Sequence, residues 1–228
     1  MTAYFDEYAL FGRLRADNAD SWRAYVAHDF VAGLADGSLP EACFRHYLGQ
    51  DYLFLIHFAR AHALAVYKAD NLADMRDASA GMSALIDKEM SLHVGYCAGW
   101  GLDEAAMAAL PEASATMAYT RYVLEAGLQG DLLDLYVALA PCVLGYGEIG
   151  ARLAGDPATR MDGNPYAAWI DTYAGDGYQQ VARAHAAALD RLWVTRAGGE
   201  RVGALSRIFG QATRLEADFW KMGLDATR

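Results

Sequence analysis

The pattern of apolar and polar residues along this chain argues against strands, because no stretch shows the sustained alternation that predicts them. Signals of helix ends recur instead. Ser38-Leu39-Pro40-Glu41 fits a capping box, and Asp131 follows Gly130 at the start of an apolar segment. A short Ala-rich helix is expected after Asp103. The pattern predicts longer helices near residues 4–15, 19–35, 40–69, 72–99, 112–128, 131–154, 165–173, 177–195 and 200–223.

The connections between these predicted helices are short, as they are in helical bundles. No low-complexity linker and no repeat of 20–50 residues interrupts the chain, and sustained heptads are missing. We therefore expect an all-α, single-domain helical bundle over residues 1–228, and not a coiled coil.

Composition narrows the class of protein. Hydrophobic residues make up 54% and charged residues 21% of the 228, an ordinary globular balance. Nineteen basic and 29 acidic residues give a net charge of −10, which repels nucleic acid and anionic membrane surfaces. The longest uncharged run, 135–147, is shorter than the ~20 residues of a spanning helix.

The three cysteines and the N-terminal sequence indicate a compartment. Cys43, Cys97 and Cys142 are odd in number and far apart, so neither a disulfide framework nor a zinc site is expected. The N-terminus lacks the basic and apolar regions of a signal peptide. We expect a cytoplasmic protein in which Cys43 and Cys97 are packing residues.

One carboxylate falls on an apolar helix face. Asp51 shares its face with the residues at i+3, i+4 and i+7, which are Phe54, Leu55 and Phe58. A carboxylate there is desolvated and needs partners. His57 or Arg60 from a neighbouring turn would supply one without any functional role. The alternative is a carboxylate that binds a ligand.

A thiol and a second acid fall in similar surroundings. Cys142 follows Pro141, which removes a backbone hydrogen bond within a helix, and Tyr146 lies one turn further on. The thiol is either a small buried group beside a core tyrosine or a group that faces a cavity. Glu216 shares a helix face with Phe219 and Trp220. It would either pair with Lys221 or Arg214, or act as an acid with a raised pKa.

Aromatic and histidine spacings leave further alternatives open. Tyr119 and Tyr122, and likewise Tyr166 and Trp169, are three residues apart, which suits a core, an interface or a flat ligand. Glu89 and His93 are four apart and could bind a metal, although di-iron bundles favour Glu-x-x-His. A paired histidine without metal is the simpler interpretation.

The order of these motifs resembles the TenA family, the thiaminase II or aminopyrimidine aminohydrolase enzymes. The resemblance covers about residues 22–222. It includes the segments Gln50-Asp51-Tyr52-Leu53, Glu89-x-x-x-His93, Tyr119-Thr120-x-Tyr122, Pro141-Cys142-x-x-x-Tyr146, Pro165-Tyr166-x-x-Trp169 and Glu216-x-x-Phe219-Trp220.

This resemblance implies a haem-oxygenase-like helical fold without haem, a homotetramer, and no metal or organic cofactor. It implies hydrolysis of 4-amino-5-aminomethyl-2-methylpyrimidine, a breakdown product of thiamin, to the hydroxymethylpyrimidine. Many members of the family also cleave thiamin itself. The expected partner is therefore a small aminopyrimidine or thiamin.

The resemblance also implies residue roles. Cys142 matches the nucleophile, Glu216 the carboxyl group on the pyrimidine ring nitrogen, and Asp51 the carboxylate on the exocyclic amine and adjacent nitrogen. Three positions match pocket tyrosines: Tyr119, Tyr146 and Tyr166. Phe54 departs from the family, which usually has tyrosine there, so a hydroxyl that could influence substrate preference is lost.

Two alternatives come from other classes of protein. Glu89, His93 and the earlier histidines would suit a dioxygen-activating enzyme with haem or a di-iron centre. Phe54 would suit a non-catalytic pyrimidine or thiamin carrier that keeps the pocket without turnover.

Overall fold

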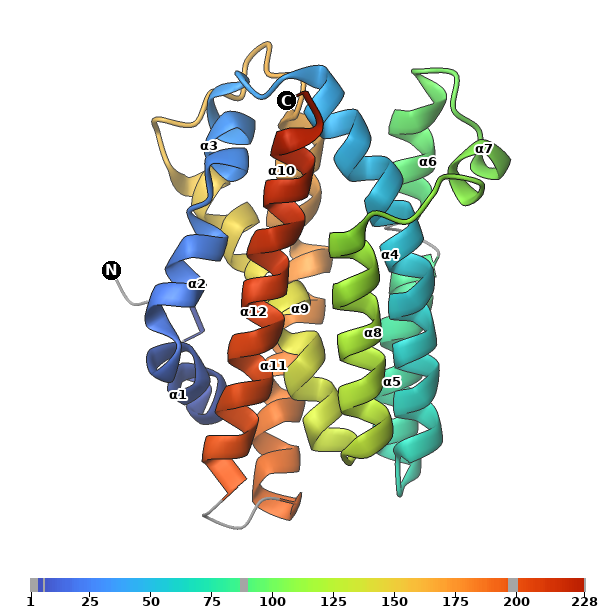
Figure 1. The fold of residues 1–228 in the computed structure, drawn as a ribbon. Coiled ribbons are helices and arrows are strands. Elements are labelled where there is room, and N and C mark those ends of the chain that lie inside the picture. The colour runs from blue at the N-terminus through green and yellow to red at the C-terminus, as the bar shows by residue number, and fades with distance from the viewer. Residues whose placement is uncertain (1–3, 6, 87–89, 197–200, 228) are drawn as a thin grey trace.

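The computed structural model describes residues 4–5, 7–86, 90–196 and 201–227. Over these residues the backbone forms helices and turns and no strand, which confirms the all-α prediction (Figure 1). The helices are α1 Ala9–Asp17, α2 Ala19–Val26, α3 Asp29–Asp36, α4 Glu41–Lys68, α5 Leu72–Ala84, α6 Met90–Ala98, α7 Glu104–Ala108, α8 Ser114–Gln129, α9 Leu132–Gly155, α10 Ala167–Ala174, α11 Asp176–Arg196 and α12 Val202–Leu224, followed by the 3-10 turn η3 Asp225–Thr227.

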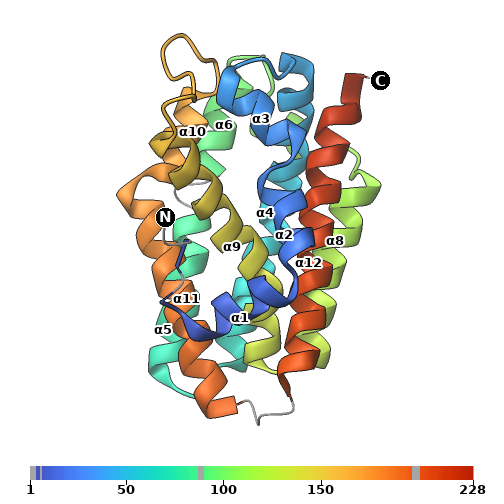
Figure 2. The same ribbon diagram turned by 90° about the vertical axis from the view of Figure 1, so that its left-hand side faces the viewer.

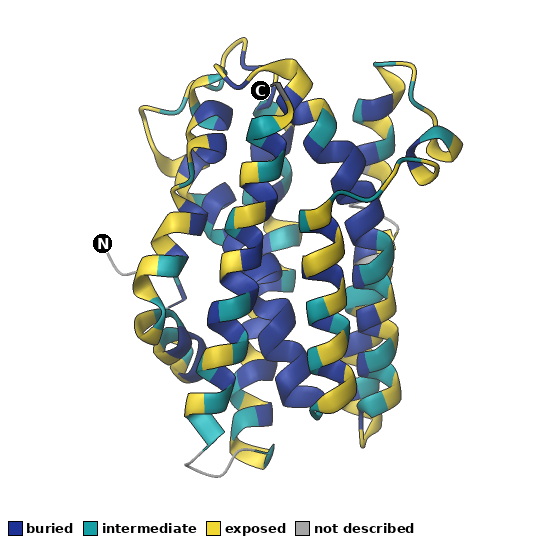
Figure 3. Cartoon of the chain, viewed as in Figure 1, coloured by how far each residue is buried: buried dark blue, intermediate teal, exposed yellow. Residues whose placement is uncertain are grey.

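Helix α9 is the centre of the bundle. It packs against α8, α10, α11 and α12, and Figure 2 shows it between these elements. Its start is fixed by a capping box between Asp131 and Asp134, as Asp131 led us to expect. It is the one described helix that is long and apolar enough to cross a membrane, but 94% of that window is buried inside the bundle. Figure 3 shows the centre of the bundle in the dark blue of buried residues, so α9 is a core helix.

Most predicted helix positions hold, and the departures have local causes. The helix expected over 19–35 is two helices, α2 and α3, because His28 interrupts it and caps α3 by accepting a hydrogen bond from the Phe30 N–H at 3.1 Å. The first helix begins at Ala9 and not near residue 4. The carboxylate of Asp190 accepts hydrogen bonds from the first two N–H groups of α1 and so fixes that start.

Two further expectations change. The Ser38 capping box is not formed: Pro40 is the N-cap of α4 without a side-chain bond, while the Ser38 N–H donates to Asp36. The helix expected over 72–99 is α5 and α6, and residues 87–89 between them lie outside the described residues.

A glycine lets α2 approach α9 next to the candidate site. A Cβ atom at Gly145 would lie 2.2 Å from the Tyr25 ring, which is far inside van der Waals contact. The Tyr25 hydroxyl donates to the Pro141 carbonyl oxygen at 3.3 Å. Its ring is fully buried between Trp22 and Trp220, so it has nowhere to move. Glycine is therefore required at this position of α9.

Candidate active site

Asp51 is buried on α4 and takes its partners from two elements. Its Oδ2 atom accepts a hydrogen bond from the Tyr47 hydroxyl at 2.9 Å and lies 2.6 Å from His93 Nε2 on α6. Both side chains of the Asp51–His93 pair are almost completely excluded from solvent. The expectation that His57 or Arg60 pairs with Asp51 is wrong, because His57 instead contacts Arg60, at 3.1 Å, towards the surface.

Tyr47 connects Asp51 to helices α9 and α10. The Trp169 Nε1–H donates to the Tyr47 hydroxyl at 3.3 Å, and the Tyr146 hydroxyl lies 3.3 Å from the same oxygen. Because Tyr47 donates its one proton to Asp51, Tyr146 is the donor in its contact with Tyr47. Burial first, and then the Asp51 carboxylate, hold the pKa of Tyr47 well above its usual value. Tyr47 is therefore a permanent donor to Asp51.

Glu216 is buried on α12 and bonds to α8. It accepts a hydrogen bond from the Tyr119 hydroxyl at 2.8 Å, and it is 2% exposed. The surface pairing considered from the sequence is wrong, since Lys221 pairs with Asp225 and Arg214 donates to Gln211. A carboxyl group in such apolar surroundings is disfavoured in its charged form.

The three candidate groups, Asp51, Cys142 and Glu216, influence the pKa values of two tyrosines. Burial raises the pKa of Tyr119 well above its usual value, and the neighbouring Glu216 and Cys142 raise it further. The pKa of Tyr146 is raised by burial and then by Tyr47, Asp51 and Glu216. Cys142 and Glu216 thus act on the same tyrosine, Tyr119, and both carboxylates act on Tyr146.

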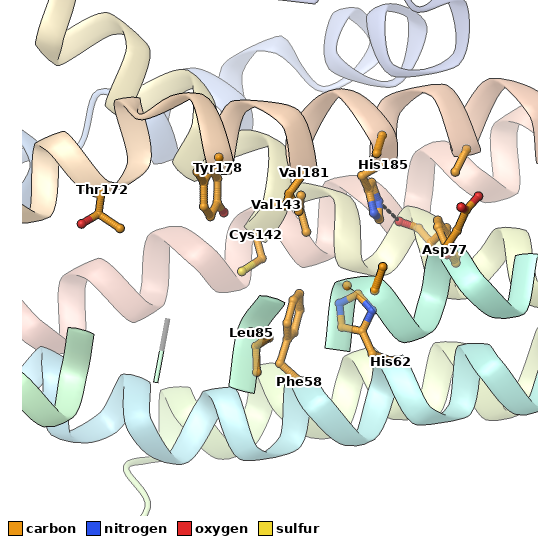
Figure 4. A pocket seen from close by; sticks show the side chains of 16 residues that line it. Phe58, His62, Asp77, Leu85, Cys142, Val143, Thr172, Tyr178, Val181 and His185 are labelled. Atoms are coloured by element: carbon orange, nitrogen blue, oxygen red, sulfur yellow. Dashed lines mark hydrogen bonds between the residues drawn. The ribbon is translucent and has the colours of Figure 1, made fainter. Parts of the chain in front are cut away.

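Cys142 opens on a cavity of about 360 Å³ between α4, α5, α9, α10 and α11. This volume is in the range of small-molecule sites. Figure 4 shows the sulfur near the middle of the cavity, with Phe58 opposite it and Tyr178 nearby. The cavity continues past Phe58 to His62 and His185. Of the predicted site residues, Cys142 alone is among the described residues that line this cavity; Asp51, Glu216, Phe54, Tyr119, Tyr146 and Tyr166 do not line it.

Phe54 and Tyr166 occupy different surroundings. The Phe54 ring packs on Tyr119 with centroids 4.9 Å apart, and on Phe58 at 5.2 Å, and of these three rings Phe58 lines the cavity. Tyr166 packs on Phe44 with centroids 4.6 Å apart, and its hydroxyl donates to the Leu39 carbonyl. Neither of these contacts of Tyr166 involves another predicted site residue.

Sequence reasoning missed Tyr47 and did not identify Asp51 as the partner of His93. Tyr47 lies one turn before Asp51, a spacing that could have indicated the bond. The interpretation of His93 as a paired histidine is confirmed by its contact with Asp51, and Glu89 lies outside the described residues. In the part of the chain that the structure describes, no three His, Cys, Asp or Glu side chains gather as a metal site would require.

Comparisons with known proteins agree with the sequence motifs. Residues 15–226 match the TENA/THI-4/PQQC family. A protein of Haemophilus influenzae is 44% identical over 204 residues, which cover 90% of this chain and 94% of that protein. The aminopyrimidine aminohydrolase of Halalkalibacterium halodurans is 37% identical over 201 residues, covering 88% of this chain and 89% of the enzyme. The crystal structure of a protein described as a TenA family transcription regulator, from Silicibacter, superimposes with a TM-score of 0.91 at 48% identity, covering 96% of this chain and 99% of that one.

Proposed function

This chain belongs to the TENA/THI-4/PQQC family, and on that premise we propose that it is an aminopyrimidine hydrolase of thiamin salvage. It converts 4-amino-5-aminomethyl-2-methylpyrimidine and water to the hydroxymethylpyrimidine and ammonia, with thiamin as the second candidate substrate. The observation that carries this proposal is the placement of the Cys142 thiol on a cavity, in a core where the buried Glu216 accepts a hydrogen bond from Tyr119. The 37% identity to an aminopyrimidine aminohydrolase supports the same reaction class.

Glu216 and Cys142 would share the activation of the ring. A neutral aminopyrimidine is a poor electrophile, and Glu216 makes it attackable by giving a proton to a ring nitrogen. The Cys142 thiolate then adds to the ring carbon beside the one that carries the exocyclic arm. The amine of the arm is protonated in the substrate, so the electron pair of the adduct expels it as ammonia. Water adds to the exposed methylene and loses a proton. The thiolate then leaves as the ring recovers its aromaticity, and the ring nitrogen returns its proton to Glu216.

Asp51 would hold the amino edge of the ring. Its Oδ2 atom is occupied by Tyr47 and His93, which fix the carboxylate in one orientation and leave Oδ1 for the exocyclic amine. Hydrogen bonds to an ionised acceptor in a dry site are strong and directional. Tyr47 and His93 are therefore positioning residues, and Asp51 is the residue that contacts the substrate.

The aromatic residues would set the plane of the ring and exclude water. Phe54, Tyr119 and Tyr146 are each 3% exposed or less. Exclusion of water strengthens the hydrogen bonds that Asp51 and Glu216 make to the substrate. Because Phe54 offers no hydroxyl, this border holds the ring by packing rather than by a further hydrogen bond.

The proposal is tested by incubating the purified protein separately with the aminomethylpyrimidine and with thiamin. Hydroxymethylpyrimidine and ammonia in equal amounts from the first compound support it. Ligand binding without product after long incubation would instead favour the carrier that Phe54 suggested. Iron in the purified protein would favour the dioxygen-activating enzyme. The homotetramer, the cytoplasmic location and the lack of a cofactor stay predictions from the sequence.

A further inference from the structure

The cavity extends well beyond the groups that the proposed reaction uses. Phe58 and His62 line the cavity one turn apart on α4, and Cys142 and Tyr136 line it six residues, about 9 Å, apart on α9. A deamination substrate whose ring is held beside Cys142 would leave the end of the cavity at Tyr136 and His62 unfilled.

The far end is built from two buried histidines and a tyrosine. His62 comes from α4, His185 from α11 and Tyr136 from α9, and all three line the cavity. Figure 4 shows the two histidines at this end. The rings of Tyr136 and His185 are stacked with centroids 5.0 Å apart, and His62 packs edge-on against Phe58. Both histidine side chains are 6% exposed. Stacked rings fix the positions of the hydrogen-bonding nitrogens.

His62 carries a hydrogen-bonding atom without a partner. Its Nδ1 is buried and has no hydrogen-bond partner among the described residues. An unpaired polar atom in a protein interior is costly and rare, and it commonly indicates a missing ligand or water. His185 differs, because its Nε2 lies 3.0 Å from the Tyr136 carbonyl oxygen. That oxygen only accepts, so Nε2 bears the proton and Nδ1 is left as an acceptor.

These groups offer hydrogen bonds without charge. Burial lowers the pKa of His62 to about 4 and that of His185 to about 3, so both rings are neutral near pH 7. Among the described residues that line the cavity, Asp77 is the one carboxylate, and it is already paired with Arg191 at 2.6 Å. A cationic group at this end would therefore be desolvated without a free counter-ion, whereas a neutral polar group would find partners.

We infer that the end of the cavity lined by His62, Tyr136 and His185 is a subsite for an uncharged, hydrogen-bonding group carried on the exocyclic arm of the pyrimidine. This inference rests on the proposed function. In that reaction the arm is attached beside the carbon that Cys142 attacks, so the arm must lie where the sulfur opens on the cavity. From there a substituent reaches past Phe58 towards His62.

The test compares two ligands that differ only in the arm. Dissociation constants are measured by calorimetry for 4-amino-5-hydroxymethyl-2-methylpyrimidine and for the N-acetyl derivative of 4-amino-5-aminomethyl-2-methylpyrimidine, whose amide is neutral. We expect the unmodified protein to bind the acetylated ligand at least about tenfold more tightly, the usual effect of one hydrogen bond in a buried site.

Two variants locate the effect at the subsite. His62→Leu removes the imidazole, and Ala188→Leu fills the same end of the cavity without touching a histidine. In both variants, the ratio of the dissociation constants of the two ligands should fall towards one. His57→Leu is the matched control: it is a histidine of the same helix that lies towards the surface, and its preference should equal that of the unmodified protein.

The possible failures are distinguishable. Equal affinity of the unmodified protein for the two ligands, or an undiminished preference in both His62→Leu and Ala188→Leu, would overturn the subsite while leaving the proposed reaction intact. Failure to bind the hydroxymethylpyrimidine, together with no ammonia release from the aminomethyl compound, would overturn the proposed function and the subsite with it.

Discussion

The Asp51–His93 pair makes a strong prediction about stability. The two side chains are 4% and 0% exposed, and the Nε2–Oδ2 distance is 2.6 Å. His93→Leu removes the histidine partner and leaves the Asp51 carboxylate in a dry interior. Among the described residues, the Tyr47 hydroxyl is then its one remaining hydrogen-bond donor. Breaking a buried pair by removing one member costs about 3–5 kcal/mol. We expect a loss of that size in the free energy of unfolding, measured by urea denaturation.

Two further variants separate this effect from the loss of any histidine. His57→Leu removes a partly exposed contact with Glu112, and we expect it to cost less than about 1 kcal/mol. His93→Gln keeps an N–H donor and should recover part of the stability. Asp51 is also the proposed substrate contact, so His93→Leu should raise the KM for the pyrimidine. A loss from His93→Leu no larger than that from His57→Leu would refute the reasoning.

Three other predictions follow from single contacts. Gly145→Ala places a Cβ atom 2.2 Å from the Tyr25 ring and should lower the free energy of unfolding in urea by about 2–3 kcal/mol. Its control, Gly155→Ala on the same helix, meets nothing within 4 Å and should change that free energy by less than about 1 kcal/mol. Equal losses in the two variants would contradict this prediction. Tyr119→Phe removes the hydrogen bond to Glu216 and should lower kcat/KM about 10-fold to 100-fold, while thermal unfolding followed by circular dichroism stays cooperative. An unchanged kcat/KM would contradict a role for that hydrogen bond. The pKa of His62, about 4, and that of His185, about 3, lie below the value near 6.5 in the unfolded chain. Below pH 6.5 the unfolded chain therefore takes up protons that the folded chain does not. The free energy of unfolding should be highest above pH 6.5 and should fall by up to about 1.4 kcal/mol per pH unit for each histidine as the pH drops to 4. His62→Leu should flatten that slope, and an unaltered slope would show that His62 titrates normally.

The sequence predicts the helices well because their ends carry local signals. Asp131 caps α9 as its position after Gly130 suggested, and α4 runs from Glu41 to Lys68 within a residue of the expected 40–69. The break between α2 and α3 was missed because it depends on a histidine nitrogen that accepts a backbone N–H, which is a rare cap with no strong sequence signature. Ser38 matched a motif, but its N–H is used by the Asp36 side chain instead.

The candidate site was harder to predict, because its partners are distant in sequence. Helical spacing placed Asp51 and Glu216 on apolar faces correctly, and both are buried. The same spacing offered His57 and Lys221 as partners, since it compares only residues of one helix. The observed partners, His93 and Tyr119, are 42 and 97 residues away. Such pairs depend on how helices pack, which the pattern of one sequence does not contain.

Attack of the Cys142 sulfur on the pyrimidine ring is the central step of the proposed reaction, and it is tested most directly by ammonia release from the aminomethylpyrimidine with Cys142→Ser. Serine nearly preserves the shape of the side chain but replaces a thiolate with a far weaker nucleophile. We predict that kcat falls at least about a hundredfold while the variant still binds the hydroxymethylpyrimidine. Ammonia release at the full rate by Cys142→Ser would contradict the assignment of this sulfur as the nucleophile.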